Sequence, residues 1–131
     1  MAESNKISVV VLSDKREQLQ MAAMIASVGA VSGNEVFVFL SMNALRYFAK
    51  GADIEAPAEG PVGILMQDKK VPPFKTLFEQ AVSLGDAKIH PCSMAMDVLG
   101  LESADLEDYV GEAMGLTMFL DEAKGGQVWS F

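Results

Sequence analysis

The residues with the clearest potential for chemistry are the only cysteine and the only histidine, Cys92 and His90, which stand two positions apart. They fall in the stretch 88–94, where a short predicted strand turns into a predicted helix. Turns of this kind hold the ligand sites of open α/β folds. A thiol in this place predicts sulfur chemistry, in which a thiolate attacks the sulfur atom of another molecule.

Cys92 is the primary candidate for a nucleophile. At a helix N-terminus it would face unpaired N–H groups and a partial positive charge, so we expect a thiol pKa below that of free cysteine. Pro91 restricts its own backbone and that of the residue before it, which would hold the thiol in place. The alternative is a buried, inert cysteine in a binding or assembly protein, and this alternative stays open because cysteine is often buried.

The remaining candidates are supporting residues. On an extended segment His90 would share a face with Cys92, but no acid is placed to orient its ring, which favours a surface or core role. Ser13 and Asp14 follow the first predicted strand, and Ser41 follows the second. Both loops would open on the same sheet edge as Cys92 and Ser93 and form walls of a site.

Several classes of site are disfavoured by missing motifs. The sequence has no P-loop, GxGxxG, GxSxG or HExxH pattern. A single cysteine excludes an internal disulfide and a cysteine-based zinc site, so we expect neither a metal nor an organic cofactor. The acidic residues between 102 and 108 have no ligand spacing and favour a solvated face.

Composition limits the partners. The chain has 131 residues, 10 basic and 18 acidic side chains, and a net charge of −8. This balance disfavours nucleic acids and anionic membrane surfaces as partners. No apolar run is long enough for a membrane span or a signal peptide core, so we expect a cytoplasmic protein with a reduced thiol.

The elements that must position the thiol can be read from hydrophobic patterning. Strands are predicted at 7–12, 36–40, 87–90 and 127–131, and helices at about 14–31, 42–50, 74–85, 93–99 and 111–123. Asp14 and Glu17 stand in the spacing of a capping box at the start of the first helix. Alternating strands and helices predict an α/β domain over 1–131 with a parallel sheet. The Pro- and Gly-rich stretch 52–73 is predicted to be a loop with one short element at 63–66, acting as a lid or an oligomer arm.

Across nearly its whole length the chain resembles the DsrE/DsrF-like family of small sulfur-trafficking proteins. The resemblance rests on the strands at 7–12 and 36–40, the helix after Pro73-Phe74, and Pro91-Cys92-Ser93-Met94 followed by Leu99-Gly100-Leu101. It implies a three-layer flavodoxin-like fold, with a mostly parallel sheet of four to five strands and helices on both faces. It also implies a homo-oligomer, often a trimer or hexamer.

The same resemblance assigns Cys92 to the sulfur-accepting position, which carries a persulfide or a thiosulfonate and passes sulfur to a partner such as a TusA-like carrier. A second cysteine found in some members is absent, so transfer must go to another molecule. The arginine that follows the cysteine in some branches is also absent.

Three hypotheses result. The first is a sulfur-transfer protein, a possible sulfurtransferase, that loads Cys92 with sulfane sulfur for an acceptor thiol protein. The second is a non-catalytic regulatory or assembly subunit with a structural Cys92. The third, a peroxide-reducing thiol enzyme, is weaker because it needs a resolving thiol from elsewhere.

Overall fold

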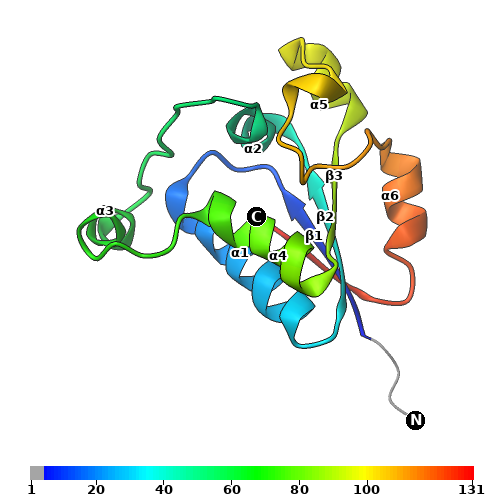
Figure 1. Cartoon of the computed structure of the whole chain (residues 1–131), viewed down its shortest axis with the longest axis horizontal. Helices are drawn as coiled ribbons and strands as arrows, with labels where there is room; N and C mark the ends of the chain where they lie inside the picture. The colour runs from blue at the N-terminus through cyan, green and yellow to red at the C-terminus, as the bar shows by residue number, and fades with distance from the viewer. Residues whose placement is uncertain (1–4) are drawn as a thin grey trace.

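The computed structural model describes residues 5–131, which form a four-stranded parallel sheet in the spatial order β3-β2-β1-β4 (Figure 1). The strands are β1 (Lys6–Val11), β2 (Glu35–Leu40), β3 (Lys88–Pro91) and β4 (Gln127–Ser130). The helices in these residues are α1 (Arg16–Val31), α2 (Met42–Leu45), α3 (Pro61–Asp68), α4 (Phe74–Gly85), α5 (Ser93–Leu99) and α6 (Leu116–Glu122). Two short 3₁₀ segments, η1 (Arg46–Phe48) and η2 (Ser103–Asp105), complete the described elements.

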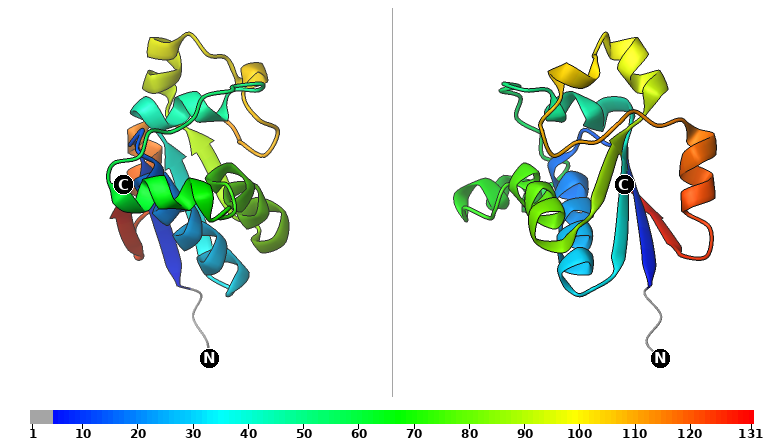
Figure 2. Two further views of the ribbon diagram at one scale, coloured as in Figure 1. Left: turned by 90° about the vertical axis from the view of Figure 1, so that its left-hand side faces the viewer. Right: turned by 45° about the vertical axis from the view of Figure 1, so that its right-hand side comes forward.

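The sheet is covered on both faces, which confirms the expected three-layer α/β architecture. Helices α1 and α4 lie side by side on one face, and α6 lies on the other (Figure 2). On the α6 side the ring of Phe119 stacks on Phe39, with ring centroids 4.8 Å apart, and lies against Phe37. Because successive strand residues point to opposite faces, the alternate positions of β2 face α1 and α4.

Strands β1 and β2 form the centre of the core. They pair in parallel from Lys6 opposite Glu35 to Val11 opposite Leu40. Their β-branched and aromatic residues suit strands that are buried on both faces. On the face that packs against α1, five apolar side chains are at most 2% exposed. These five are Val9, Val11, Val36, Val38 and Leu40.

The chain reverses its direction across the sheet after β3. From β1 it moves outward to β2 and β3, and it then returns to place β4 on the other side of β1. The topological switch point therefore lies between β1 and β4. Cys92 follows β3 at the sheet edge, so the predicted strand-to-helix turn is present but does not lie at the switch point.

Two predicted helices are shorter than expected. The helix expected at 42–50 ends at Leu45 and continues as η1, and Ala49 then pairs in an isolated bridge with Leu106. The helix expected at 111–123 begins only at Leu116. Its first residues are extended instead, because they hydrogen-bond to the outer edge of β3.

The start of α1 also differs from the expectation. Its N-cap is Lys15, which makes no side-chain cap, so the predicted capping box of Asp14 and Glu17 does not form. The Ser13 hydroxyl instead accepts the Lys15 N–H at 3.0 Å. The Glu17 carboxylate instead accepts the backbone N–H groups of Glu59 and Gly60.

Close packing of α4 on α1 depends on Gly85. A Cβ built on Gly85 would lie 2.5 Å from the Cβ of Ala30 and 2.7 Å from its carbonyl carbon. The left-handed position that ends α4 is taken by Asp86, with φ 58°. Gly85 is therefore required for the approach of the two helices.

We expect Gly85→Ala to lower the free energy of unfolding by about 1–3 kcal/mol, because the added methyl group overpacks the α1–α4 contact. Ser83→Ala, at an exposed position of the same helix, is the matched control and should change it by less than about 0.5 kcal/mol. Urea denaturation of both variants measures the difference. Equal stability of the two variants would contradict this role of Gly85.

Candidate functional site

Cys92 is held by backbone hydrogen bonds at the junction of β3 and α5. It is the N-cap of α5, with extended backbone angles, and its N–H donates to the Leu40 carbonyl at the end of β2 at 2.8 Å. Its own carbonyl accepts the Met96 N–H at 3.0 Å. The residue is 7% exposed. The only thiol of the chain is thus fixed at the carboxyl end of a strand, close to the first turn of a helix.

The other side of Cys92 is closed by residues 111–115. The Gly111 N–H donates to Ile89 O at 2.7 Å, and the Met114 N–H donates to Pro91 O at 2.9 Å. Met114 also forms a parallel bridge with Cys92 and accepts the Ser93 N–H at 3.0 Å. This segment follows the outer edge of β3 without forming a further strand of the four-stranded sheet. A Cβ on Gly111 would lie 3.1 Å from Ile89 O, which is a tight contact.

His90 has a structural environment. Its ring stacks on Phe37 with centroids 4.9 Å apart, and its Nδ1 lies 2.8 Å from the Glu112 carbonyl oxygen. Because a carbonyl can only accept, Nδ1 carries a proton in this contact. The ring is oriented by a backbone carbonyl and not by a carboxylate, and the residue is partly buried.

The supporting residues divide into a near and a far group. The near group is Ser41 and Ser93. Ser41 is 6% exposed and directly follows Leu40, whose carbonyl accepts the Cys92 N–H. Ser93 is the first residue of α5 and is exposed. Ser13 and Asp14 follow β1, one strand further along the sheet and so roughly 10 Å from the end of β3.

The two far residues have local structural contacts. The Asp14 carbonyl accepts the Tyr47 hydroxyl at 3.0 Å, and its carboxylate lies 4.0 Å from the Lys15 ammonium. Together with the Lys15 N–H on the Ser13 hydroxyl, these contacts fix the loop after β1.

Sequence reasoning missed a set of exposed apolar residues at the strand ends. Leu12, Met42 and Met94 lie one, two and three residues beyond the ends of β1, β2 and β3, and they are 42%, 51% and 52% exposed. Met42 has a φ of 50°, an uncommon conformation for a residue other than glycine. Met96 of α5, in contrast, is buried at 6% exposure.

Residues 52–73, here called the strap, are tied to the first turns of α1. The Glu17 carboxylate accepts the N–H groups of Glu59 at 2.8 Å and Gly60 at 2.7 Å. The strap contains a full helix, α3, where one short element was predicted. A side chain at Gly63 would collide with the Glu17 carboxylate, so the glycine allows the strap to lie on α1.

Two further side chains of α1 fix the strap. Arg16 Nη1 donates to the Gly63 carbonyl at 2.6 Å, and Gln20 Nε2 donates to the Pro72 carbonyl at 3.0 Å. Side chains of α1 therefore hold the strap at residues 59–60, at Gly63 and at Pro72.

The best-formed cavities of residues 5–131 lie along this strap and beside α6, and Cys92 lines none of the three. Within the same residues, no cluster of three or more His, Cys, Asp or Glu side chains is placed to hold a metal ion. None of the helices in this part of the chain is long and apolar enough to cross a membrane.

Comparison with known proteins agrees with this architecture. The model of the DsrE/DsrF/DrsH-like family matches residues 54–131, and the chain belongs to that family. Among solved structures, the YchN protein from E. coli has a TM-score of 0.70 and 17% sequence identity, over 98% of this chain and 100% of the other. MTH1491 from Methanobacterium thermoautotrophicum, a protein of unknown function, has a TM-score of 0.63 and 8% identity over the same shares. None of the curated proteins matches the chain.

The family assignment confirms the resemblance drawn from the sequence, and the two solved structures share the α/β fold. Membership of this family is associated with sulfur relay, so the family assignment favours sulfur chemistry over other classes of reaction. At 17% and 8% identity, the two solved structures support the shared fold and do not assign a role to any residue of this chain.

We expect the attachment of the strap to depend on the charge of Glu17. Hydrogen bonds from the Glu59 and Gly60 N–H groups lower the pKa of Glu17 below its usual 4.5, chiefly through Glu59. A lowered pKa contributes stability that is present above pH 4.5 and is lost as the pH falls through the folded-state value. In NMR titrations the Glu59 and Gly60 amide shifts should move together, with a midpoint below pH 4.5.

A matched pair of variants checks the same contact at neutral pH. Glu17→Ala should make the Gly60 amide exchange several-fold faster, because its acceptor is lost. Glu79→Ala, which removes an exposed carboxylate from α4, should leave that exchange rate unchanged. Slow Gly60 exchange in Glu17→Ala would show that the strap is held by other contacts.

Proposed function

We propose that this protein is a sulfur carrier that holds sulfane sulfur on Cys92 and passes it to the thiol of an acceptor protein. The observation that supports this most directly is the position of the only thiol, at the N-cap of α5 and fixed to the end of β2 by its backbone. Membership of a family associated with sulfur relay supports the same chemistry. The proposed setting is the cytoplasm, where a lone thiol stays reduced.

The proposed reaction has two thiol exchanges. In the first, the Cys92 thiolate attacks the outer sulfur of a donor persulfide R–S–SH, the donor S–S bond breaks, and RS⁻ leaves while Cys92–S–SH forms. In the second, an acceptor thiolate attacks the outer sulfur of this persulfide and regenerates the Cys92 thiolate. No electrons are gained or lost overall, so neither a metal nor an organic cofactor is required.

Burial of the thiol limits how it is reached. Cys92 is 7% exposed, and its outer side is covered by residues 111–115 through three backbone hydrogen bonds. Two glycines, Gly111 and Gly115, bound this segment, so we expect it to move when the thiol reacts. The exposed Leu12, Met42 and Met94 at the neighbouring strand ends offer an apolar surface to an acceptor, which the family resemblance suggests is a TusA-like carrier.

The test is intact mass spectrometry after incubation with polysulfide, with thiosulfate in a second reaction. We expect Cys92 to gain the mass of one sulfur atom, and dithiothreitol to remove it. Cys92→Ser should gain nothing while keeping the circular dichroism spectrum of the parent chain. Loading that persists in Cys92→Ser, or a folded parent chain that gains no sulfur, would contradict the proposal.

The alternative is a non-catalytic assembly or regulatory subunit with a structural Cys92. The low exposure of the thiol favours it. Under this alternative, native protein resists both polysulfide and a small reagent such as methyl methanethiosulfonate, and reacts only after denaturation. A carrier reacts with both in its native state, so the same samples separate the two functions.

We also propose that the chain forms a homo-oligomer, a trimer or hexamer by the family resemblance, through the α6–β4 face. Large apolar side chains on these two neighbouring elements are 54–59% exposed. They are Leu116, Met118, Leu120 and Val128. Strand β4 is also an edge of the sheet, and its four residues are all exposed. An apolar surface of this kind is typical of a protein contact.

Sedimentation velocity of the parent chain and two matched variants checks this interface. Met118→Glu places a charge in the α6–β4 face and should convert the oligomer to a monomer. Ile64→Glu introduces the same charge at a position of α3 that is 61% exposed, against 56% for Met118, and should leave the oligomer intact. A monomeric parent chain at tens of micromolar, or dissociation caused only by Ile64→Glu, would refute this interface.

A further inference from the structure

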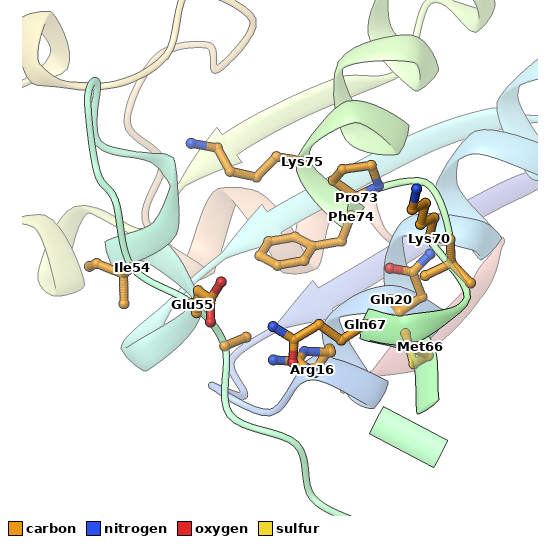
Figure 3. Close-up of a pocket in the computed structure, with 12 residues that line it drawn as sticks. Arg16, Gln20, Ile54, Glu55, Met66, Gln67, Lys70, Pro73, Phe74 and Lys75 are labelled. Atoms are coloured by element: carbon orange, nitrogen blue, oxygen red, sulfur yellow. The ribbon is translucent and has the colours of Figure 1, made fainter. Parts of the chain in front are cut away.

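A cavity of about 320 Å³ lies between the strap, the start of α1 and the start of α4 (Figure 3). The ring of Phe74 projects into it, and the side chains of Arg16 and Glu55 face the same space. Its volume is in the range of small-molecule sites, and it lies outside the surroundings of Cys92. Neither the sulfur-carrier proposal nor the oligomer proposal uses it.

The charge of the cavity is opposite to that of the whole protein. Three cations line it, Arg16, Lys70 and Lys75, although the chain has only 10 basic residues and a net charge of −8. The Lys75 ammonium is paired with the Glu107 carboxylate at 2.8 Å, and Glu55 adds one negative charge to the lining. Within residues 5–131 Arg16 and Lys70 have no carboxylate within ion-pair distance. One positive charge therefore remains unbalanced in the cavity.

Two helix N-termini lie beside this cavity. Arg16 opens α1, a helix of 16 residues, and Phe74 opens α4, a helix of 12 residues. The N-caps Lys15 and Pro73 provide no side-chain acceptor to either helix. The N-terminal dipole of a helix favours a negative group nearby. The first turn of α1 already holds the Glu17 carboxylate, and the Arg16 N–H donates to the Pro57 carbonyl, so the start of α4 is the N-terminus that favours an anion in this cavity.

The backbone of the strap holds one of the cations in an unfavourable conformation. Lys70 has a φ of 54°, in the left-handed region that residues other than glycine rarely adopt. Such strain is tolerated where surrounding contacts fix it, and it is common at binding sites. Here the adjacent Pro72 carbonyl is tied to Gln20 of α1.

An apolar cavity of about 480 Å³ adjoins the first one. The two share Gln20, Met66 and Val71 as lining residues. The rest of the second cavity is mostly apolar and includes Met24 and Leu77. Its polar residues are Ser27 and Glu17, whose carboxylate is bound by the Glu59 and Gly60 N–H groups. A cationic cavity beside an apolar one matches a ligand with one charged end and one hydrocarbon end.

We infer that the strap covers a binding site for a small amphipathic monoanion, with the chemistry of a medium-chain carboxylic acid. The carboxylate would bind near Arg16 and Lys70, and the hydrocarbon chain would lie along Met66 and Val71 toward the apolar cavity. A single negative charge balances the one unpaired positive charge, whereas a phosphate dianion would be opposed by Glu55. This site is independent of the thiol chemistry.

Isothermal titration calorimetry of the full chain with octanoate tests the inference. We expect saturable binding of octanoate, and binding at least about tenfold weaker for octyl phosphate, for uncharged octanamide and for butyrate, which lacks the longer chain. Binding of octanamide as tight as that of octanoate, or no binding of octanoate up to millimolar concentration, would overturn the inference. Tighter binding of octyl phosphate would overturn the assignment of a monoanion.

Two adjacent lysines provide a matched pair of variants. Lys70→Glu should weaken octanoate binding by about tenfold or more, and Lys70→Gln should have an intermediate effect. Lys69→Glu makes the same charge change at an exposed position outside the cavity and should change affinity by less than about twofold. If Lys69→Glu and Lys70→Glu weaken octanoate binding equally, the loss of affinity comes from net charge alone, and this result would contradict the proposed site. Cys92→Ser should bind octanoate normally, so this test and the sulfur-loading test can fail separately.

Discussion

The hydrogen bond from the Cys92 N–H to the Leu40 carbonyl extends the β2–β3 pairing one residue beyond the sheet, and the local structure around the thiol depends on it. It sets the direction in which α5 begins and places Cys92 beside Ser41. Because the bond joins backbone groups, strand register sets the position of the Cys92 backbone. The register in turn is fixed by β1 and β2, since a shift of one residue would turn their apolar side chains to the wrong faces.

The second constraint is the first two turns of α1. Arg16, Glu17 and Gln20 all bind backbone groups of the strap, which has few buried side chains of its own. Within α3 only Gly63 is buried, so the strap is held by polar contacts and not by an apolar core. A segment held in this way has lower local stability than the sheet, and this suits an element that covers a cavity.

Patterning predicted the sheet well because its strands are short β-branched runs with clear ends. It also placed Cys92 correctly at the start of α5, where Gly100 with φ 70° ends the helix as expected. It failed where contacts distant in sequence decide the structure. Glu17 has capping-box spacing from Asp14, yet it binds residues more than 40 positions away. Residues 111–115 looked helical, but the open edge of β3 offered backbone acceptors that the sequence alone does not reveal.

The thiol and the strap cavity differ in how far the surrounding structure must change before each can react or bind. Cys92 lies under a segment held by a few backbone hydrogen bonds, so the proposed sulfur transfer would require a local opening and a partner surface. The strap cavity already has its charges and apolar lining in place. The YchN and MTH1491 structures share 17% and 8% identity with this chain, so they support the common fold and not the side chains of the cavity. The case for a ligand in the cavity therefore depends on the side chains of this sequence alone.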